Sequence, residues 1–201
     1  YANLARAKLY GTNLTGANLR GANLSKVLLR MTILKGTNLS EAELTFASLI
    51  WLDLRDVDLR GADLSRANLT EANLVGANLS GVNLSGANLT SANLKGAFLI
   101  GADITKATID KEYLDQAILC NTRTIDGAVS DCDLRNIDFT MTNLSGVDLR
   151  DKDLTGANLS GVDLSGKDLS GTTLVQANLS GTNLSGVDLS GKDLSGTTLV
   201  Q

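Results

Sequence analysis

The chain has 201 residues, among them 20 Gly but no Pro and no His, and a formal net charge of −4. Without His it lacks the imidazole base of Ser–His and Cys–His enzymes and the commonest zinc ligand, which argues against those classes of site. The mild charge selects no nucleic acid or membrane surface as partner, and no apolar run reaches the roughly 18 residues of a transmembrane helix.

An apolar residue recurs at nearly every fifth position from Leu4 to Leu199. Of these forty central positions 39 are Leu, Ile, Val or Phe, and Thr124 is the exception. The residue two before each centre is mostly small, 27 of the 40 residues directly before it are Asn or Asp, and 19 of the 20 glycines follow a centre by two residues. A period of five fits neither a helix nor a flat strand, so we expect a chain that turns a corner every five residues and keeps each centre inward.

The five-residue units resemble a known family. Residues 17–21 (Ala-Asn-Leu-Arg-Gly) and 77–81 (Ala-Asn-Leu-Ser-Gly) are similar to the A-[DN]-L-x-x motif of the pentapeptide-repeat family. The resemblance covers nearly all of the chain. It implies an all-β solenoid, a right-handed quadrilateral parallel β-helix with twenty residues per coil and about ten coils. The small and central residues would point inward and the other three outward.

Residues 1–107 keep this pattern, but several outward positions there are apolar instead of polar. Because residues twenty apart should lie above one another, Met31 and Trp51 are expected at one corner, and Arg30 and Ile50 in one column. Exposed apolar groups with a nearby Trp and Arg are typical of protein interaction sites, although such side chains can also pack over one another without binding anything. The candidate interaction surface is Leu28, Arg30, Met31, Ile33, Phe46, Ile50 and Trp51. A weaker patch is predicted where Phe98 and Ile100 lie above Ile118 and Cys120.

The pattern degrades between residues 108 and 133, where Glu112 occupies a small position and Thr124 a central one. This segment is similar to a stretch that closes the repeats in some cyanobacterial members of the family, yet here the repeats resume. We therefore predict two units, residues 1–133 and residues 134–201, which are either one natural chain or a fusion. Cys120 and Cys132 form no recognisable framework and are interpreted as free thiols.

The second unit, rich in Asp, Gly and Ser, is expected to continue the same helix. Lys152, Lys167 and Lys192 occupy its small inward positions. An unpaired ammonium there would cost several kcal/mol, so we expect these side chains to reach solvent or the backbone to adjust, and these coils to be less well ordered. Three acidic residues twenty apart could hold calcium, but a solvated polar face is favoured, and no metal or cofactor is predicted; these residues are Asp148, Asp168 and Asp188.

These features favour a non-catalytic structural or protein-interaction scaffold. The alternative is a DNA-mimic inhibitor of DNA gyrase, which the resemblance suggests because some family members act in that way. Duplex DNA as long as a ten-coil rod carries about 28 negative charges, whereas this chain has 22 acidic and 18 basic residues. We therefore expect a protein partner, with no direct nucleic-acid binding and no membrane binding. Uncapped ends are compatible with end-to-end association of copies. No signal peptide is visible, which favours the cytoplasm.

Overall fold

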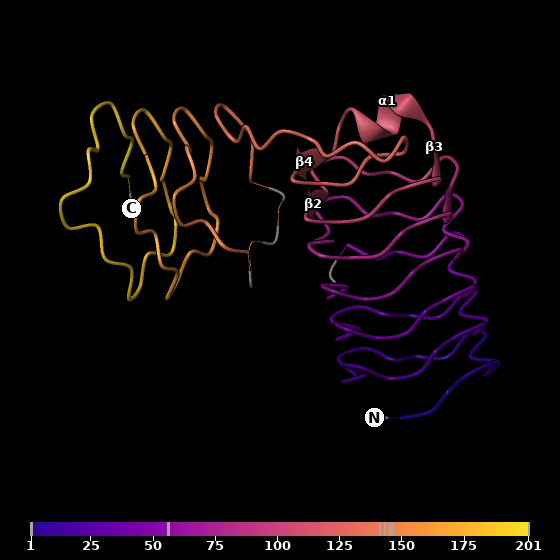
Figure 1. Cartoon of the computed structure of the whole chain (residues 1–201). Helices are drawn as coiled ribbons and strands as arrows, with labels where there is room; N and C mark the ends of the chain where they lie inside the picture. The colour runs from indigo at the N-terminus through magenta and orange to yellow at the C-terminus, as the bar shows by residue number, and fades with distance from the viewer. Residues whose placement is uncertain (1, 56, 141, 143, 145–146, 201) are drawn as a thin grey trace. The chain divides into compact units, whose positions relative to one another are not determined.

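The computed structural model describes residues 2–55, 57–140, 142, 144 and 147–200. The chain divides into two compact units, an N-terminal unit, Tyr1–Asp131, and a C-terminal unit, Cys132–Gln201. Each unit is a stack of coils (Figure 1). The regular elements are few and short: β1 (Asn88–Leu89), β2 (Phe98–Ile100), β3 (Thr108–Ile109), α1 (Lys111–Leu114) and β4 (Ile118–Cys120).

Adjacent coils are joined by parallel bridges between residues twenty apart. Asn3 pairs with Asn23, which pairs with Glu43 and so on along the column, and β1 with β3 and β2 with β4 keep the same register. Each bridge uses two backbone hydrogen bonds, as where Leu24 donates to the carbonyl of Glu43 and Glu43 donates to that of Ala22. A coil therefore holds twenty residues, or four of the five-residue repeats, which confirms the predicted stacking period.

A tight turn separates each repeat from the next. The amide of Ala7 donates to the carbonyl of Leu4, and Arg6, the third residue of this turn, has φ 62°. Glycine reaches this left-handed region without strain, which explains why glycines gather there. The Asn or Asp before the centre stabilises the turn locally, because Oδ1 of Asn13 accepts the amide of Thr15 at 3.0 Å.

Stacked leucines and small residues form the core of the N-terminal unit. Leu24, Leu44 and Leu64 are fully buried, and Ala42 and Ala62 at the small positions are equally buried. Where Thr replaces Ala, its hydroxyl finds an acceptor in the preceding coil: Thr37 donates to the carbonyl of Leu14 at 2.8 Å, and the same bond recurs at other threonines of both units. The predicted division into inward and outward positions is thus confirmed for most repeats.

The irregular segment predicted at 108–133 contains α1, the only α-helix among the described residues. Its four residues are too few to cross a membrane, and no span long and apolar enough to do so occurs in the described part of the chain. After β4 the chain turns back on itself, since Arg123 pairs antiparallel with Val129. Thr124, the one polar centre, lies within this reversal, where its hydroxyl donates to Oδ1 of Asp126 at 2.6 Å.

Two expectations for this region are wrong. Phe98, Ile118 and Cys120 are buried, with 0%, 7% and 0% of their surface exposed, so the weaker patch is not a surface. The predicted stacking holds, because Phe98 pairs with Ile118, but these side chains lie in the interior although their positions in the repeat face outward elsewhere. Cys120 and Cys132 are disulfide-bonded rather than free thiols.

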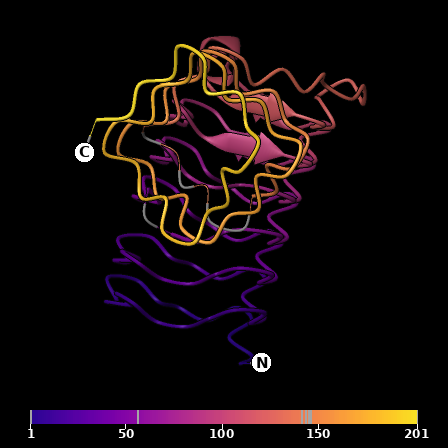
Figure 2. The same cartoon turned by 90° about the vertical axis from the view of Figure 1, so that its left-hand side faces the viewer.

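The coils of the C-terminal unit, orange to yellow in Figure 2, follow the same rules except at the lysines. The ammonium of Lys167 donates to the carbonyl of Val147 at 2.9 Å, and that of Lys192 to the carbonyl of Thr172 at 3.0 Å. In neighbouring columns the corresponding carbonyl accepts a backbone amide, as Ala157 accepts that of Asn178. Within the described residues, neither Asp168 nor Asp193 has such a bridge. The lysine ammonium therefore replaces the backbone donor.

Candidate functional site

The predicted interaction surface lies on one side of the first coils. In the second coil this side runs from the turn at residues 25–26 to the turn at residues 30–31, and Leu28 stands at its middle. Leu28 pairs with Lys8 in the coil before and with Ser48 in the coil after, so residues 5–11, 45–51 and 65–71 belong to the same side. We call residues 5–11, 25–31, 45–51 and 65–71 the cationic side, because nearly all of their charged residues are basic.

The structure brings six of the seven predicted residues to this side or its corners. Leu28, Met31, Phe46 and Trp51 are 48%, 62%, 50% and 55% exposed, while Ile50 is half-buried. Ile33, although 52% exposed, lies around the corner on the adjoining side, where it pairs with Asn13. Most of the predicted apolar side chains are thus exposed, and Ile33 is the outlying member of the group.

Cations cover the aromatic rings at both corners. The guanidinium of Arg30 lies 4.5 Å from the centre of the Trp51 ring. At the other corner Phe46 has two cations, the ammonium of Lys26 at 5.7 Å and the guanidinium of Arg66 at 5.4 Å. Lys26, Phe46 and Arg66 follow one another in successive coils, so the ring stands between them in its column. Such contacts attract a cation to the ring and fix its position.

Sequence reasoning missed the basic residues of this side. Arg6, Lys8, Lys26 and Arg66 accompany Arg30, and the only Asp or Glu in the four segments is Glu71. Tyr10 was also missed; its hydroxyl donates to the sulfur of Met31. Writing the sequence in rows of twenty reveals the pattern, because Arg6, Lys26, Phe46 and Arg66 then fall in one column.

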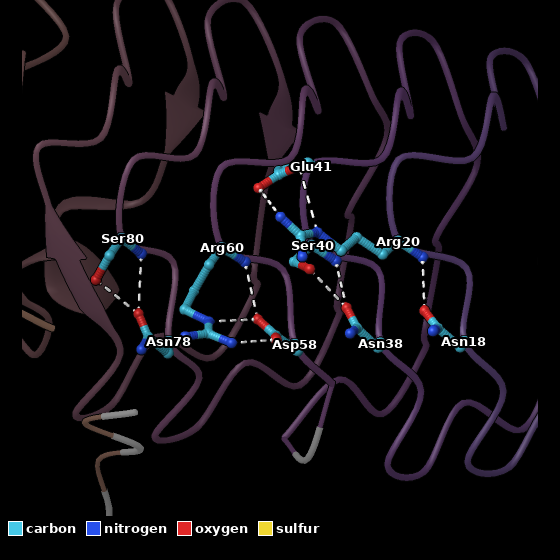
Figure 3. A network of polar contacts seen from close by, with 9 residues as sticks. All are labelled: Asn18, Arg20, Asn38, Ser40, Glu41, Asp58, Arg60, Asn78 and Ser80. Atoms are coloured by element: carbon cyan, nitrogen blue, oxygen red, sulfur yellow. Dashed lines mark hydrogen bonds and ion pairs between the residues drawn. The ribbon is translucent and has the colours of Figure 1, made fainter. Parts of the chain in front are cut away.

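The side that contains residues 15–21, 35–41, 57–61 and 75–81 is built differently (Figure 3). Its arginines bind carboxylates: Arg20 lies 2.8 Å from Glu41, and Arg60 lies 2.6 Å from Asp58. Hydrogen bonds from Arg60 hold the pKa of Asp58 below its usual range. In the described N-terminal unit, Arg55 and Arg123 also have carboxylate partners, whereas the three arginines of the cationic side have none within 4.0 Å.

The corners of the cationic side contain several residues other than Gly at positive φ. Among the residues described between Arg6 and Arg66, seven other than Gly have positive φ, and six of them flank the cationic side, with Glu41 as the exception. A side chain in this region costs about 1 kcal/mol relative to Gly, and more for bulky residues. Phe46 at φ 57° and Trp51 at φ 62° are the bulkiest examples. The corners of this side therefore hold large side chains at positions where the fold favours glycine.

The described residues of the C-terminal unit form no comparable group. Among the described residues no group of three or more Asp, Glu, Cys or His could hold a metal ion. Asp148, part of the column considered for calcium, is already bonded to Arg150 at 2.7 Å. A shallow cleft lies between residues 166–173 and 186–193, where the lysines interrupt the bridges, and it is lined by Lys167, Lys192 and mainly small polar residues.

Comparisons with known proteins agree with the repeat. The sequence profile of pentapeptide repeats matches residues 1–119 and 132–200 in overlapping segments. HetL, a pentapeptide repeat protein involved in heterocyst differentiation regulation in the cyanobacterium Nostoc sp. strain PCC 7120, is 32% identical; the alignment covers 98% of this chain and 86% of HetL, with a TM-score of 0.29.

Two further solved structures are more distant. A pentapeptide repeat protein of the Arabidopsis thaliana thylakoid lumen is 27% identical over 64% of this chain and 83% of its own, with a TM-score of 0.26. QnrB1, a plasmid-mediated fluoroquinolone resistance protein, is 18% identical over 98% of this chain and 89% of its own, with a TM-score of 0.40. No curated protein sequence matches the chain. Because the family profile covers most of its length, the chain belongs to the pentapeptide repeat family.

Proposed function

We propose that the protein is a non-catalytic scaffold that binds another protein through the cationic side of its N-terminal unit. One observation carries this proposal. Six of the ten large apolar side chains that the described residues leave exposed fall between Tyr10 and Trp51. An exposed apolar group of this density, with a Trp and an Arg in contact, has the composition of a binding hot spot.

The chemistry of the described residues gives no support to an enzyme. The chain has no His, and each of its two Cys is disulfide-bonded, so neither supplies a thiolate nucleophile. The aspartates with lowered pKa values accept hydrogen bonds from their own turns, as Asp103 does from Thr105, which is a structural use of the carboxylate. We expect no cofactor requirement.

The proposal also includes the handedness, the number of coils and the unit boundary of the fold. We expect the coils to wind in a right-handed sense with four sides, about ten coils to the whole chain, and a division into units 1–133 and 134–201. A crystal structure of the full chain would test the handedness and the division together. End-to-end association of copies is part of the same proposal. Sedimentation of the chain as a monomer at all concentrations would contradict it.

A direct test of the binding surface compares three proteins that differ by one side chain. The intact chain, Trp51→Ala and a matched variant, Val129→Ala, would be immobilised and exposed to extracts of cells that encode the protein. Val129 is 63% exposed but lies outside the cationic side. We expect a protein that is retained by the intact chain and by Val129→Ala but lost with Trp51→Ala. Equal retention by all three, with unchanged thermal stability, would remove the reason for choosing this surface.

The cationic side does not suit the DNA-mimic alternative. A mimic of duplex DNA needs rows of unneutralised carboxylates, because DNA carries one negative charge about every 1.7 Å. The cationic side has five Lys and Arg against the single carboxylate of Glu71, and Asp58, Asp133 and Asp148 elsewhere are bonded to arginines. We therefore expect no inhibition in a gyrase supercoiling assay; inhibition below micromolar concentration that weakens with salt would reverse this choice.

A further inference from the structure

The charge of the cationic side points to the chemistry of its partner. Its cations have no carboxylate within ion-pair distance, whereas every other arginine described in the N-terminal unit does. In a chain with more acidic than basic residues, this leaves one basic surface beside a group of apolar side chains. We propose that the cationic side binds an acidic polypeptide segment that carries apolar residues between its carboxylates. The inference rests on the proposed function and adds the class of the partner.

Ring contacts position the cations before such a ligand binds. A guanidinium packed over an aromatic ring keeps its N–H donors at its edge, and those donors match the two oxygens of a carboxylate. Arg30 over Trp51, and Arg66 over Phe46, have this arrangement. Because the side chains are already positioned, less conformational entropy is lost when a carboxylate binds.

The spacing of the cations also fits an extended chain. Lys26 and Arg66 are two coils apart, so their backbones are separated by about 10 Å at the usual strand spacing. One turn of a polyproline II segment, three residues, spans about 9 Å and returns side chains i and i+3 to the same side. A segment in this conformation that lies along the stack with Glu at every third position could therefore place carboxylates near both cations, and an apolar residue between them near Phe46.

Single-stranded nucleic acid is the competing ligand for a basic surface with aromatic residues, but the rings are unsuited to it. Bases stack on open ring faces in such complexes. Phe46 has cations from both neighbouring coils, and Trp51 has Arg30 over its ring. The rings thus hold the cations in place rather than offering stacking platforms.

The backbone strain gives independent support. Arg6, Lys26, Phe46 and Arg66 have φ values of 62°, 58°, 57° and 58° at one corner, where Gly86 continues the column in the next coil. Glycine would stabilise each of these turns, so stability does not explain the large side chains. Strain that stability does not explain is often found at functional sites.

Trp51, the only tryptophan in the chain, gives a direct measurement. The full chain would be titrated with the peptide (Glu-Ser-Leu)5, its uncharged analogue (Gln-Ser-Leu)5, and the oligonucleotide dT15, while the Trp51 emission is followed. We expect a saturable change with the Glu peptide that weakens as salt is added, and binding of the Gln analogue at least about tenfold weaker.

Glycine variants separate binding from folding. The double variant Lys26→Gly and Arg66→Gly removes two cations but relieves two strained turns, so we expect about tenfold weaker binding of the Glu peptide and an unfolding midpoint that is unchanged or higher. Glu41→Gly, on another corner with φ 59°, is the matched control and should leave the affinity unchanged.

Three results would overturn the inference: equal affinity for the Glu and Gln peptides, preference for dT15, or full affinity in the double glycine variant. None of these would by itself remove the proposed function. A protein captured by the intact chain and lost with Trp51→Ala would still stand, with a partner that is not acidic. Conversely, peptide binding without any Trp51-dependent capture would support the surface chemistry but contradict the scaffold role in those cells.

Discussion

The two units are built from the same repeat but differ at one position. Two residues before each centre, the N-terminal unit has Ala, Val, Thr or another uncharged residue through its regular coils, and bridges between coils form at residues such as Asn73 and Asn93. The C-terminal unit has Lys at three of these positions, and the bridges fail beside Lys167 and Lys192. The small residue therefore does more than fill the core. It allows the neighbouring coils to approach closely enough for their backbones to pair.

The lysines show which interaction replaces the lost one. Their ammonium groups donate to the carbonyls of Val147 and Thr172, so the acceptor in the preceding coil stays satisfied while the amides of Asp168 and Asp193 lose their partners. A charge at an inward position can be tolerated because it is hydrogen-bonded and only half-buried. The cost is the loss of the backbone bridges at Asp168 and Asp193.

The largest effect should come from moving the lysine into the N-terminal unit. Ala92 is fully buried, and its neighbour Asn93 donates to the carbonyl of Ala72 at 2.9 Å. We expect Ala92→Lys to lower the free energy of unfolding by about 3 kcal/mol, since a fully enclosed site cannot let the ammonium reach water. Hydrogen exchange at the amide of Asn93 and urea unfolding would measure the change.

Ala92→Val is the matched control, because Val82 occupies the same position one repeat pair earlier and is 1% exposed. The valine variant should lose far less stability and keep the exchange protection of Asn93. If Lys and Val cost the same, volume rather than charge would determine what the small position accepts.

The comparison also shows what could be read from the sequence. The period of five predicted that Leu24 and its equivalents point inward, and the family resemblance implied the twenty-residue coil that stacks Phe98 on Ile118. It could not predict that this column is buried, because an outward position says nothing about what covers it. The exposed apolar group was predicted in the same way, but cations such as Lys26 beside Phe46 were missed, because a Lys at an outward position fits the polar pattern of the repeat and does not stand out.

The reverse substitution should restore a backbone bridge in the C-terminal unit. Lys192→Ala removes the competing donor and gives this position the residue that the regular coils have. We expect the amide of Asp193 to form its bond to Thr172, with a gain of about 1 kcal/mol in that unit. Slower hydrogen exchange at Asp193 is the measurement. Unchanged exchange there would mean that the coils are held apart by something other than the lysine.

A smaller effect should distinguish the turns of the two units. The described turns of the C-terminal unit mostly have Gly at positive φ, such as Gly161 and Gly181, whereas the cationic side has Arg6, Lys26 and Arg66. We expect Arg66→Gly to raise stability, and Gly86→Ala, in the next coil of the same column, to lower it, each by up to about 1 kcal/mol. Thermal unfolding of both variants checks this. An Arg66→Gly variant that is less stable would show that its contact with Phe46 outweighs the backbone strain.

The smallest effect concerns a type of ion pair that occurs in both units, between an Asp and the Arg two residues after it. Hydrogen bonds from the Arg135 side chain, and then from its backbone amide, lower the pKa of Asp133 from 3.8 to about 2. Because the pKa is lower in the folded state, the stabilisation is complete above pH 3.8 and is lost as the pH falls through about 2. The carboxyl carbon of Asp133 can be titrated by NMR. Arg135→Ala should raise this pKa only partway to 3.8, because the amide of residue 135 still donates to Oδ1 at 3.1 Å. A pKa that stays near 2 in the variant would assign the shift to the turn of the repeat itself, which the Asn residues of the N-terminal unit share, rather than to the arginine.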